Sequence, residues 1–331
     1  MNGKTKEEIK MKKTTMLLCI AAGVLLAGSC AKTIEAPHPE KMNITLTASI
    51  ANPGTKTEYA EKAGGGLSVT WSAGDQMSLL VIGSDGTVVS NTVLENQSGA
   101  AKDAEFTGTI PTLAEGQRYL CVYPALSGEL TDLKSSAGWV KYDAEGKKLV
   151  YDPYPEDQQF YVNSTLGTWQ NAFKEADLMV GVPDISGTAA NVVLERQIGV
   201  LKLIIKITDD LKAVPFTLCG LVNAAHAKSF VTSMESELSA GTTAFAGTAK
   251  PMAAAAFNTP LDTSAGELAV YLPFGPGSIP AGAYQVAIAD MENDVYRVGV
   301  ISATAAVPIV AGQMTTLTIG GITEWINPED M

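Results

Sequence analysis

Few residues of this chain have the type and spacing that chemistry needs. The strongest candidate is Cys30, which follows three small residues at positions 27–29 and an apolar run over residues 16–26. The run is too short to span a bilayer, and small residues at its end fit the cleft of a signal peptidase. A thiol at this point can take a diacylglyceryl group before cleavage. The pattern predicts a signal peptide over residues 1–29 and a lipidated Cys30.

Residues 27–30 resemble the bacterial lipobox, with Ala27 where leucine is usual. The alternative is an ordinary signal peptide that is cleaved at another position. After Cys30 the chain is polar and contains prolines without apolar periodicity, so residues 30–41 predict a lipidated cysteine followed by a flexible tether. A lipid anchor of this kind predicts stable attachment to a membrane, with the folded part outside the cytoplasm.

Groups suited to catalysis are sparse. They are two histidines and two acidic pairs: His38, His226, Glu235 with Glu237, and Asp209 with Asp210. The first histidine lies in the tether and the second in a predicted loop, and no nucleophile motif accompanies either. Strand alternation places the first acidic pair on one solvated face, and the second pair falls in a predicted turn. With no HExxH, P-loop or EF-hand motif in the sequence, we predict no enzyme activity, no cofactor and no metal site.

Charge and cysteine content restrict the class of protein further. The formal net charge is −12, and the 29 residues before Cys30 hold five Lys and two Glu, so the remainder carries −15. This charge argues against nucleic acid as a partner. Cys121 and Cys219 lie in separate apolar runs without metal-ligand spacing, which favours two buried thiols over a disulfide.

Period-two patterns dominate the elements that must position these residues. The expected strands, separated by Gly, Pro, Asn and Asp, are 43–50, 77–82, 117–123, 267–272, 284–288, 295–301 and 314–319. Residues 170–177 form the best helical candidate, and Trp71 is expected in the core. Many short strands at this spacing predict an all-β protein built of β-sandwiches.

The segment 191–207 predicts one longer strand with a break. Its apolar face changes phase near Gly199, which a strand cannot do without an extra residue, so we expect a β-bulge or kink there. The turn-rich stretch 181–190 just upstream predicts a boundary between two domains, at residues 42–187 and 188–331.

Several ordered segments carry a resemblance to a known family. They are residues 55–57 (TKT), 71–77 (WSAGDQM), 104–110 (AEFTGTI), 119–124 (YLCVYP), Pro155 with Gln158 and Gln159, 177–180, 194–203, 309–313 and 316–319. In this order, behind a lipobox, they resemble the fimbrillin-like (Mfa-like) lipoproteins, the subunits and relatives of type V pili.

The resemblance implies two tandem transthyretin-like β-sandwich domains and a role as a pilus subunit, anchor or tip adhesin. It also implies export to the outer membrane, with the protein lipid-anchored at the cell surface or in a fimbrium. In the family's polymerising subunits, an arginine-specific protease removes the N-terminus with its first strand, and a strand of a neighbouring subunit fills the groove. This chain departs from that pattern because its three arginines after Cys30, at positions 118, 196 and 297, all follow the first predicted strand. Its tail after Ile319 is also short for a donor strand. These departures favour an anchor, tip or accessory subunit over a stalk pilin.

The first predicted strand is the candidate element for assembly with other pilus subunits. Its apolar face consists of Ile44, Leu46, Ala48 and Ile50. Following the family, we expect the strand to occupy an edge of the first sandwich and to fill a groove there.

Aromatic residues support a second hypothesis, a surface glycan-binding lipoprotein module. Aromatics gather over residues 139–161, and Trp139 and Tyr154 are the candidates for an exposed recognition surface that contacts host or bacterial glycans or proteins.

Overall fold

The structure is a computed structural model. It describes residues 40–51, 60–61, 67–68, 70–99, 101–154, 159–162, 169–240, 244–320 and 322. Strands dominate this part of the chain, so the all-β class is confirmed, whereas the number of domains stays a prediction. The seven expected strands all occur, with bounds that differ by at most a few residues.

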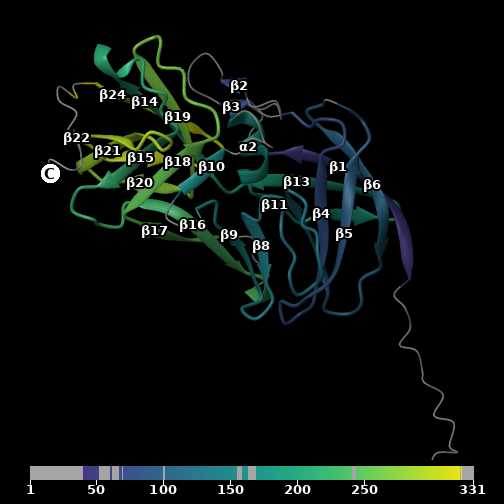
Figure 1. Cartoon of the computed structure of the whole chain (residues 1–331). Helices are drawn as coiled ribbons and strands as arrows, with labels where there is room; N and C mark the ends of the chain where they lie inside the picture. Colours follow the sequence, from purple (N-terminus) through teal and green to yellow (C-terminus); the bar gives the residue numbers. More distant parts are fainter. Residues whose placement is uncertain are drawn as a thin grey trace, which may run out of the picture. The chain divides into compact units, whose positions relative to one another are not determined.

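The largest sheet contains eight strands. In spatial order they are β1 (Lys41–Ile50), β6 (Ala104–Pro111), β5 (Val88–Asn96), β4 (Gln76–Ile82), β7 (Arg118–Tyr123), β11 (Met179–Gly181), β13 (Ala189–Arg196) and β12 (Asp184–Ser186). β1 also pairs in parallel with β13, so seven of these strands form a closed hydrogen-bonded ring (Figure 1). Within that ring each strand has a neighbour on both sides, which removes the open edges that invite unwanted pairing.

Three further sheets hold most of the remaining strands. The five-stranded sheet has the order β10 (Gln159–Val162), β18 (Met252–Phe257), β15 (Leu218–Asn223), β21 (Gly282–Asp290) and β22 (Val295–Ala303). The three-stranded sheet has the order β19 (Glu267–Phe274), β14 (Gly199–Lys206) and β24 (Met314–Ile319). The four-stranded sheet has the order β17 (Ala246–Lys250), β16 (Phe230–Glu237), β9 (Lys148–Tyr151) and β8 (Val140–Asp143).

Short elements complete the described chain. Two small ladders pair β2 (Ala60–Glu61) with β3 (Leu67–Ser68), and β20 (Gly277–Ile279) with β23 (Val307–Ile309). The 3₁₀ turns η1 (Asp209–Leu211) and η2 (Leu238–Ala240) lie in connections. The helix α2 spans Trp169–Ala176 and confirms the expected helix; its buried residues Ala172, Phe173 and Ala176 have the spacing of one helical face.

The expected long strand over 191–207 is wrong in one respect. β13 ends at Arg196 and β14 begins at Gly199, and the two belong to different sheets. The phase of the apolar face changes because the chain crosses from one sheet to the other, not because one strand bulges. A glycine is required at position 199 by close packing and not by a bulge. An added Cβ would lie 2.6 Å from the carbonyl oxygen of Val310.

The predicted domain boundary falls in a hairpin turn. Ser186 of β12 pairs with Ala189 of β13, and Gly187 between them has a positive φ of 62°, which glycine adopts without strain. Strands from the two sides of residue 187 also pair with each other, β1 with β13, β9 with β16, and β10 with β18. The division into domains 42–187 and 188–331 stays a prediction.

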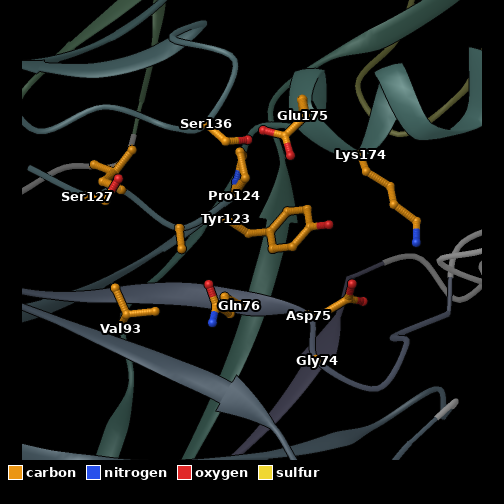
Figure 2. A pocket seen from close by; sticks show the side chains of 12 residues that line it. Gly74, Asp75, Gln76, Val93, Tyr123, Pro124, Ser127, Ser136, Lys174 and Glu175 are labelled. Carbon is orange, nitrogen blue, oxygen red and sulfur yellow. The ribbon is translucent and has the colours of Figure 1, made fainter. Parts of the chain in front are cut away.

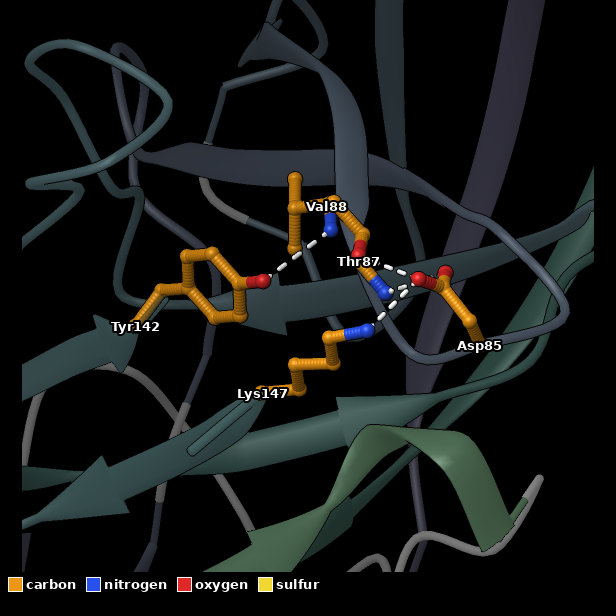
Figure 3. A network of polar contacts seen from close by, with 5 residues as sticks. All are labelled: Asp85, Thr87, Val88, Tyr142 and Lys147. Carbon is orange, nitrogen blue, oxygen red and sulfur yellow. Dashed lines mark hydrogen bonds and ion pairs between the residues drawn. The ribbon is translucent and has the colours of Figure 1, made fainter. Parts of the chain in front are cut away.

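A polar network joins the β4–β5 turn to the β8–β9 turn (Figure 3). The Lys147 ammonium lies 2.6 Å from Asp85, which also accepts hydrogen bonds from the backbone N–H and the hydroxyl of Thr87. The Tyr142 hydroxyl accepts the backbone N–H of Val88 at 3.2 Å. The hydrogen bond from Lys147 holds the pKa of the Asp85 carboxyl below its usual value. Because the ion pair is exposed, it orients the two turns more than it stabilises the fold.

The buried core includes the residues expected there. Trp71 is fully buried between Phe106 and Tyr123, with ring centroids at 5.0 and 5.3 Å in edge-to-face geometry. Cys121 and Cys219 are separate buried thiols, as predicted, and burial raises the pKa of both, that of Cys219 to about 12. Neither thiol is therefore a ready nucleophile.

Candidate functional site

The candidate site is the slot in which β1 lies. Along this strand the side chains alternate strictly, with Ile44, Leu46, Ala48 and Ile50 buried and the intervening residues exposed or half-buried. This is the pattern that the sequence predicts, because successive side chains of a strand point to opposite faces. The buried face of β1 thus belongs to the core of the ring.

β1 is held on both sides. It runs antiparallel to β6 over eight paired positions, from Lys41 to Ala48, and parallel to β13 over six, from Thr45 to Ile50. The expectation that β1 occupies an edge is therefore wrong. The parallel partner lies about 145 residues further along the chain, and no local pattern in the sequence reveals such a pairing.

Main-chain hydrogen bonds extend the pairing at both ends of the strand. The N–H of Thr45 donates to the carbonyl of Thr188 at 3.0 Å, and the N–H of Ala51 donates to the carbonyl of Leu194 at 2.8 Å. On the other side, Thr112 donates to the carbonyl of Glu40 at 2.7 Å. Removal of β1 would leave two rows of unpaired backbone groups, on β6 and on β13, that face the same gap.

The inner face of the slot selects side chains by size. Leu46 lies between Phe106 of β6 and Ala190 of β13, whereas Ala48 lies between Ala104 and Val192. All of these side chains are at most 3% exposed. Leu46 therefore occupies a position that accepts a large side chain beside Phe106, and Ala48 one that accepts a small one.

The backbone of Ala48, the residue with the small side chain, is held by Trp71. The indole Nε1 of this residue donates a hydrogen bond to the carbonyl oxygen of Ala48 at 3.1 Å, and its ring is fully buried. A buried indole N–H requires a partner, so the carbonyl at this point of the strand satisfies it. The slot thus recognises both a main-chain oxygen and a small side chain at the same residue.

The outer face of β1 is polar. Thr109 donates to the side-chain oxygen of Asn43 at 2.7 Å, and a shallow cleft of about 410 Å³ lies over residues of β1 and β6 and over Thr188. Gly108 is paired with the buried Ile44, and an added Cβ there would lie 2.4 Å from the end of the buried Leu94 side chain, on the inner face. The outward face therefore remains hydrated while the inward face is sealed.

The predicted recognition surface is wrong. Tyr154 is fully buried, its hydroxyl donates to the carbonyl of Pro273 at 3.1 Å, and its ring stacks on Phe274 at 6.0 Å. Trp139 is 6% exposed. Trp139 and Tyr154 flank β8 and β9, which are strands of the four-stranded sheet and not projecting loops. Both aromatic side chains therefore belong to the buried core.

The remaining candidate groups show no catalytic arrangement among the described residues. His226 lies in an exposed turn, and Glu235 and Glu237 point to solvent from β16, as the sequence predicts. Glu235 forms an ion pair with Lys148 at 2.7 Å. Within the described ranges, no group of three or more His, Cys, Asp or Glu residues has the arrangement of a metal site.

Cys30, the predicted lipidation site, lies outside the described residues, as does His38. Of the helices that the structure describes, none has the length and apolar character that a membrane span requires.

Comparison with known proteins gives structural neighbours only. No family model and no curated protein matches the chain. A solved structure from Bacteroides uniformis, described as a candidate cell adhesion protein, is similar at 16% identity and a TM-score of 0.43, over 84% of this chain and 93% of that one. Another candidate cell adhesion protein, from Bacteroides ovatus, is similar at 11% identity and a TM-score of 0.48, over 85% of this chain and 92% of that one.

A fimbrial protein from Bacteroides ovatus is similar at 14% identity and a TM-score of 0.34, and the match spans 86% of this chain but about half (49%) of that one. The solved structures similar to this chain include two that are described as candidate cell adhesion proteins and one that is described as a fimbrial protein, all from Bacteroides.

Proposed function

We propose that this chain is a fimbrillin-like surface lipoprotein that serves as a structural or adhesive component of a pilus and assembles with other subunits by strand addition. The observation that supports it is the placement of β1, the first described strand, in a slot between β6 and β13. A strand that lies first in the fold can leave without breaking the chain elsewhere, and the vacated slot offers main-chain partners on both sides.

The energetics favour an occupied slot. Burial of Ile44, Leu46 and Ile50 contributes about 1.5–3 kcal/mol per side chain. An intact chain is then complete by itself, whereas a chain without β1 exposes apolar core and unpaired strand edges. Such a chain recruits a replacement strand or aggregates.

Within a pilus we propose an anchor, tip or accessory position rather than a stalk position. No arginine precedes or lies within β1, and the later ones make structural contacts: Arg196 forms a buried bidentate ion pair with Asp177 at 2.5 and 2.7 Å. The side chain of Arg196 is 3% exposed, and that of Asp177 1%. An arginine-specific protease has no site for releasing β1 alone, so a chain that keeps its N-terminus stays attached through its lipid.

The assembly proposal is tested by comparing the chain from Gly54 onward with the chain from Ala31 onward. We expect the longer form to be monomeric and the shorter form to polymerise or aggregate and to melt at a lower temperature. Light scattering after size exclusion, thermal unfolding and electron microscopy measure these properties. A shorter form that stays monomeric, soluble and equally stable to heat rules out strand addition.

A synthetic peptide of residues 41–51 sharpens this test. It should bind the shorter form and restore its melting temperature, whereas a matched peptide with Leu46→Asp should not, because the slot buries that position beside Phe106. Equal binding of both peptides would show that the slot does not select the strand.

Lipid attachment is tested by Cys30→Ser in the full chain. We expect this variant to lose labelled palmitate and to leave the membrane fraction, since the thiol is the attachment atom. The matched control is Cys219→Ser, which removes a buried thiol and leaves the predicted anchor in place. Retention of the label by the Cys30 variant would refute the lipoprotein assignment.

A further inference from the structure

A pocket of about 270 Å³ lies away from β1, where three parts of the chain meet. The turn before β4 supplies Asp75, the end of β7 supplies Tyr123, and α2 supplies Lys174 and Glu175. Figure 2 shows these side chains around one space, with the two helix residues on one side of the Tyr123 ring and Asp75 on the other. No short motif joins these residues, so the sequence does not reveal the pocket.

One oxygen in this pocket lacks a partner. The Oε2 atom of Glu175 is buried and makes no hydrogen bond with any described residue. A buried carboxylate oxygen without a donor costs free energy, and a ligand hydroxyl or an ordered water removes that cost. Glu175 is therefore the group in the pocket that most needs a hydrogen-bond donor.

The neighbouring groups are held in place by the fold. One oxygen of Asp75 accepts the backbone N–H of Ser72 at 2.6 Å, and burial raises the pKa of this carboxyl. The ring of Tyr123 packs edge-on against Trp71, and burial raises the pKa of its hydroxyl well above the usual value, so the phenol stays protonated. The pocket thus presents a fixed acceptor at Asp75, and the buried Tyr123 forms part of its wall.

The mixture of charges is not that of a dedicated site for a simple ion. Two carboxylates repel an anion, and the Lys174 ammonium repels a cation. Gln76 and Ser136 add groups that both donate and accept hydrogen bonds. A neutral polyhydroxylated ligand matches this set, because each of its hydroxyls also donates and accepts hydrogen bonds.

We propose that this pocket binds one neutral sugar residue of a glycan. In this arrangement Glu175 and Asp75 accept hydrogen bonds from sugar hydroxyls, and Lys174 donates to a sugar oxygen. The inference does not depend on strand addition, because none of these residues belongs to β1, β6 or β13. It also differs from the sugar-binding surface expected at Trp139 and Tyr154, both of which are buried.

The test uses the whole chain from Ala31 and saturation-transfer NMR with glucose, galactose, mannose and N-acetylglucosamine as separate probes. We expect transfer to at least one sugar, and we expect Glu175→Gln to weaken its binding at least about tenfold, because a hydrogen bond to a charged group is lost. The matched control is Glu129→Gln, which makes the same change at an exposed residue outside the pocket and should leave binding unchanged.

A second variant guards against misfolding. Lys174→Gln removes the ammonium while keeping a polar side chain on the helix, and it should also weaken binding with an unchanged melting temperature. Glycine and alanine serve as zwitterionic probes and should give no transfer. The proposal is overturned if none of the four sugars shows transfer, if binding survives both pocket variants, or if the zwitterions bind in place of the sugars.

Discussion

At the scale of single residues, Asp75 links the pocket to stability. Burial raises its pKa above the ordinary value of 3.8, against the opposing effects of Ser72 and Lys174. The folded chain then holds this proton more tightly than the unfolded chain does, so the contribution of Asp75 to stability falls as the pH rises from 3.8 through the folded pKa.

This sign gives a prediction for Asp75→Asn, which cannot lose a proton. The melting temperature of the variant minus that of the parent should increase between pH 4 and pH 7, as measured by circular dichroism. Glu129→Gln, which makes a similar change at an exposed carboxyl, is measured over the same range as the matched control. A difference for Asp75→Asn that falls with rising pH would contradict the burial of this carboxyl.

At the scale of elements, close backbone approach requires a glycine at the first residue of β14. An added Cβ on Gly199 would meet the carbonyl oxygen of Val310 at 2.6 Å and the side chain of Ile309 at 2.7 Å. Among the described residues, none comes within 4 Å of a Cβ added to Gly320, which follows β24. Comparing an alanine substitution at each of these two glycines therefore distinguishes the effect of close packing from the general effect of replacing glycine.

We predict that Gly199→Ala lowers the free energy of unfolding by about 1–3 kcal/mol, because the β23–β24 connection must move. Gly320→Ala should change it by less than about 0.5 kcal/mol. Urea denaturation followed by tryptophan fluorescence measures both. If both variants change the free energy of unfolding by the same small amount, the backbone at Val310 moves aside without loss of stability.

At the scale of the whole molecule, pairing between distant strands determines which pieces can fold. β13 supplies the parallel partner of β1, yet it lies beyond the predicted boundary at residue 187. A piece that ends at residue 187 lacks this partner and leaves β1 and β11 with an open side, whereas a piece that ends at residue 197 keeps the ring closed.

We therefore predict that residues 42–197 are more soluble and melt more cooperatively than residues 42–187. Differential scanning calorimetry and size exclusion of the two pieces make the comparison. If the shorter piece melts as cooperatively and at the same temperature, the boundary at residue 187 stands and the β1–β13 pairing contributes little.

The sequence by itself determined the local features of this protein. Alternation with a period of two identified the strands and the buried face of β1, a short amphipathic stretch identified α2, and apolar surroundings identified Trp71 and the two thiols as core residues. These features follow from side-chain direction and hydrophobicity within a few residues, which a single sequence displays directly.

Only the tertiary structure decided which strands pair and which aromatics are covered. It placed β13 beside β1, buried Tyr154 against Pro273 and Phe274, and brought Glu175 to the same pocket as Asp75. Each of these depends on contacts between residues about 100 or more positions apart, whose partners are chosen by the packing of whole sheets. A repeating local pattern is compatible with many such pairings, so it does not select among them.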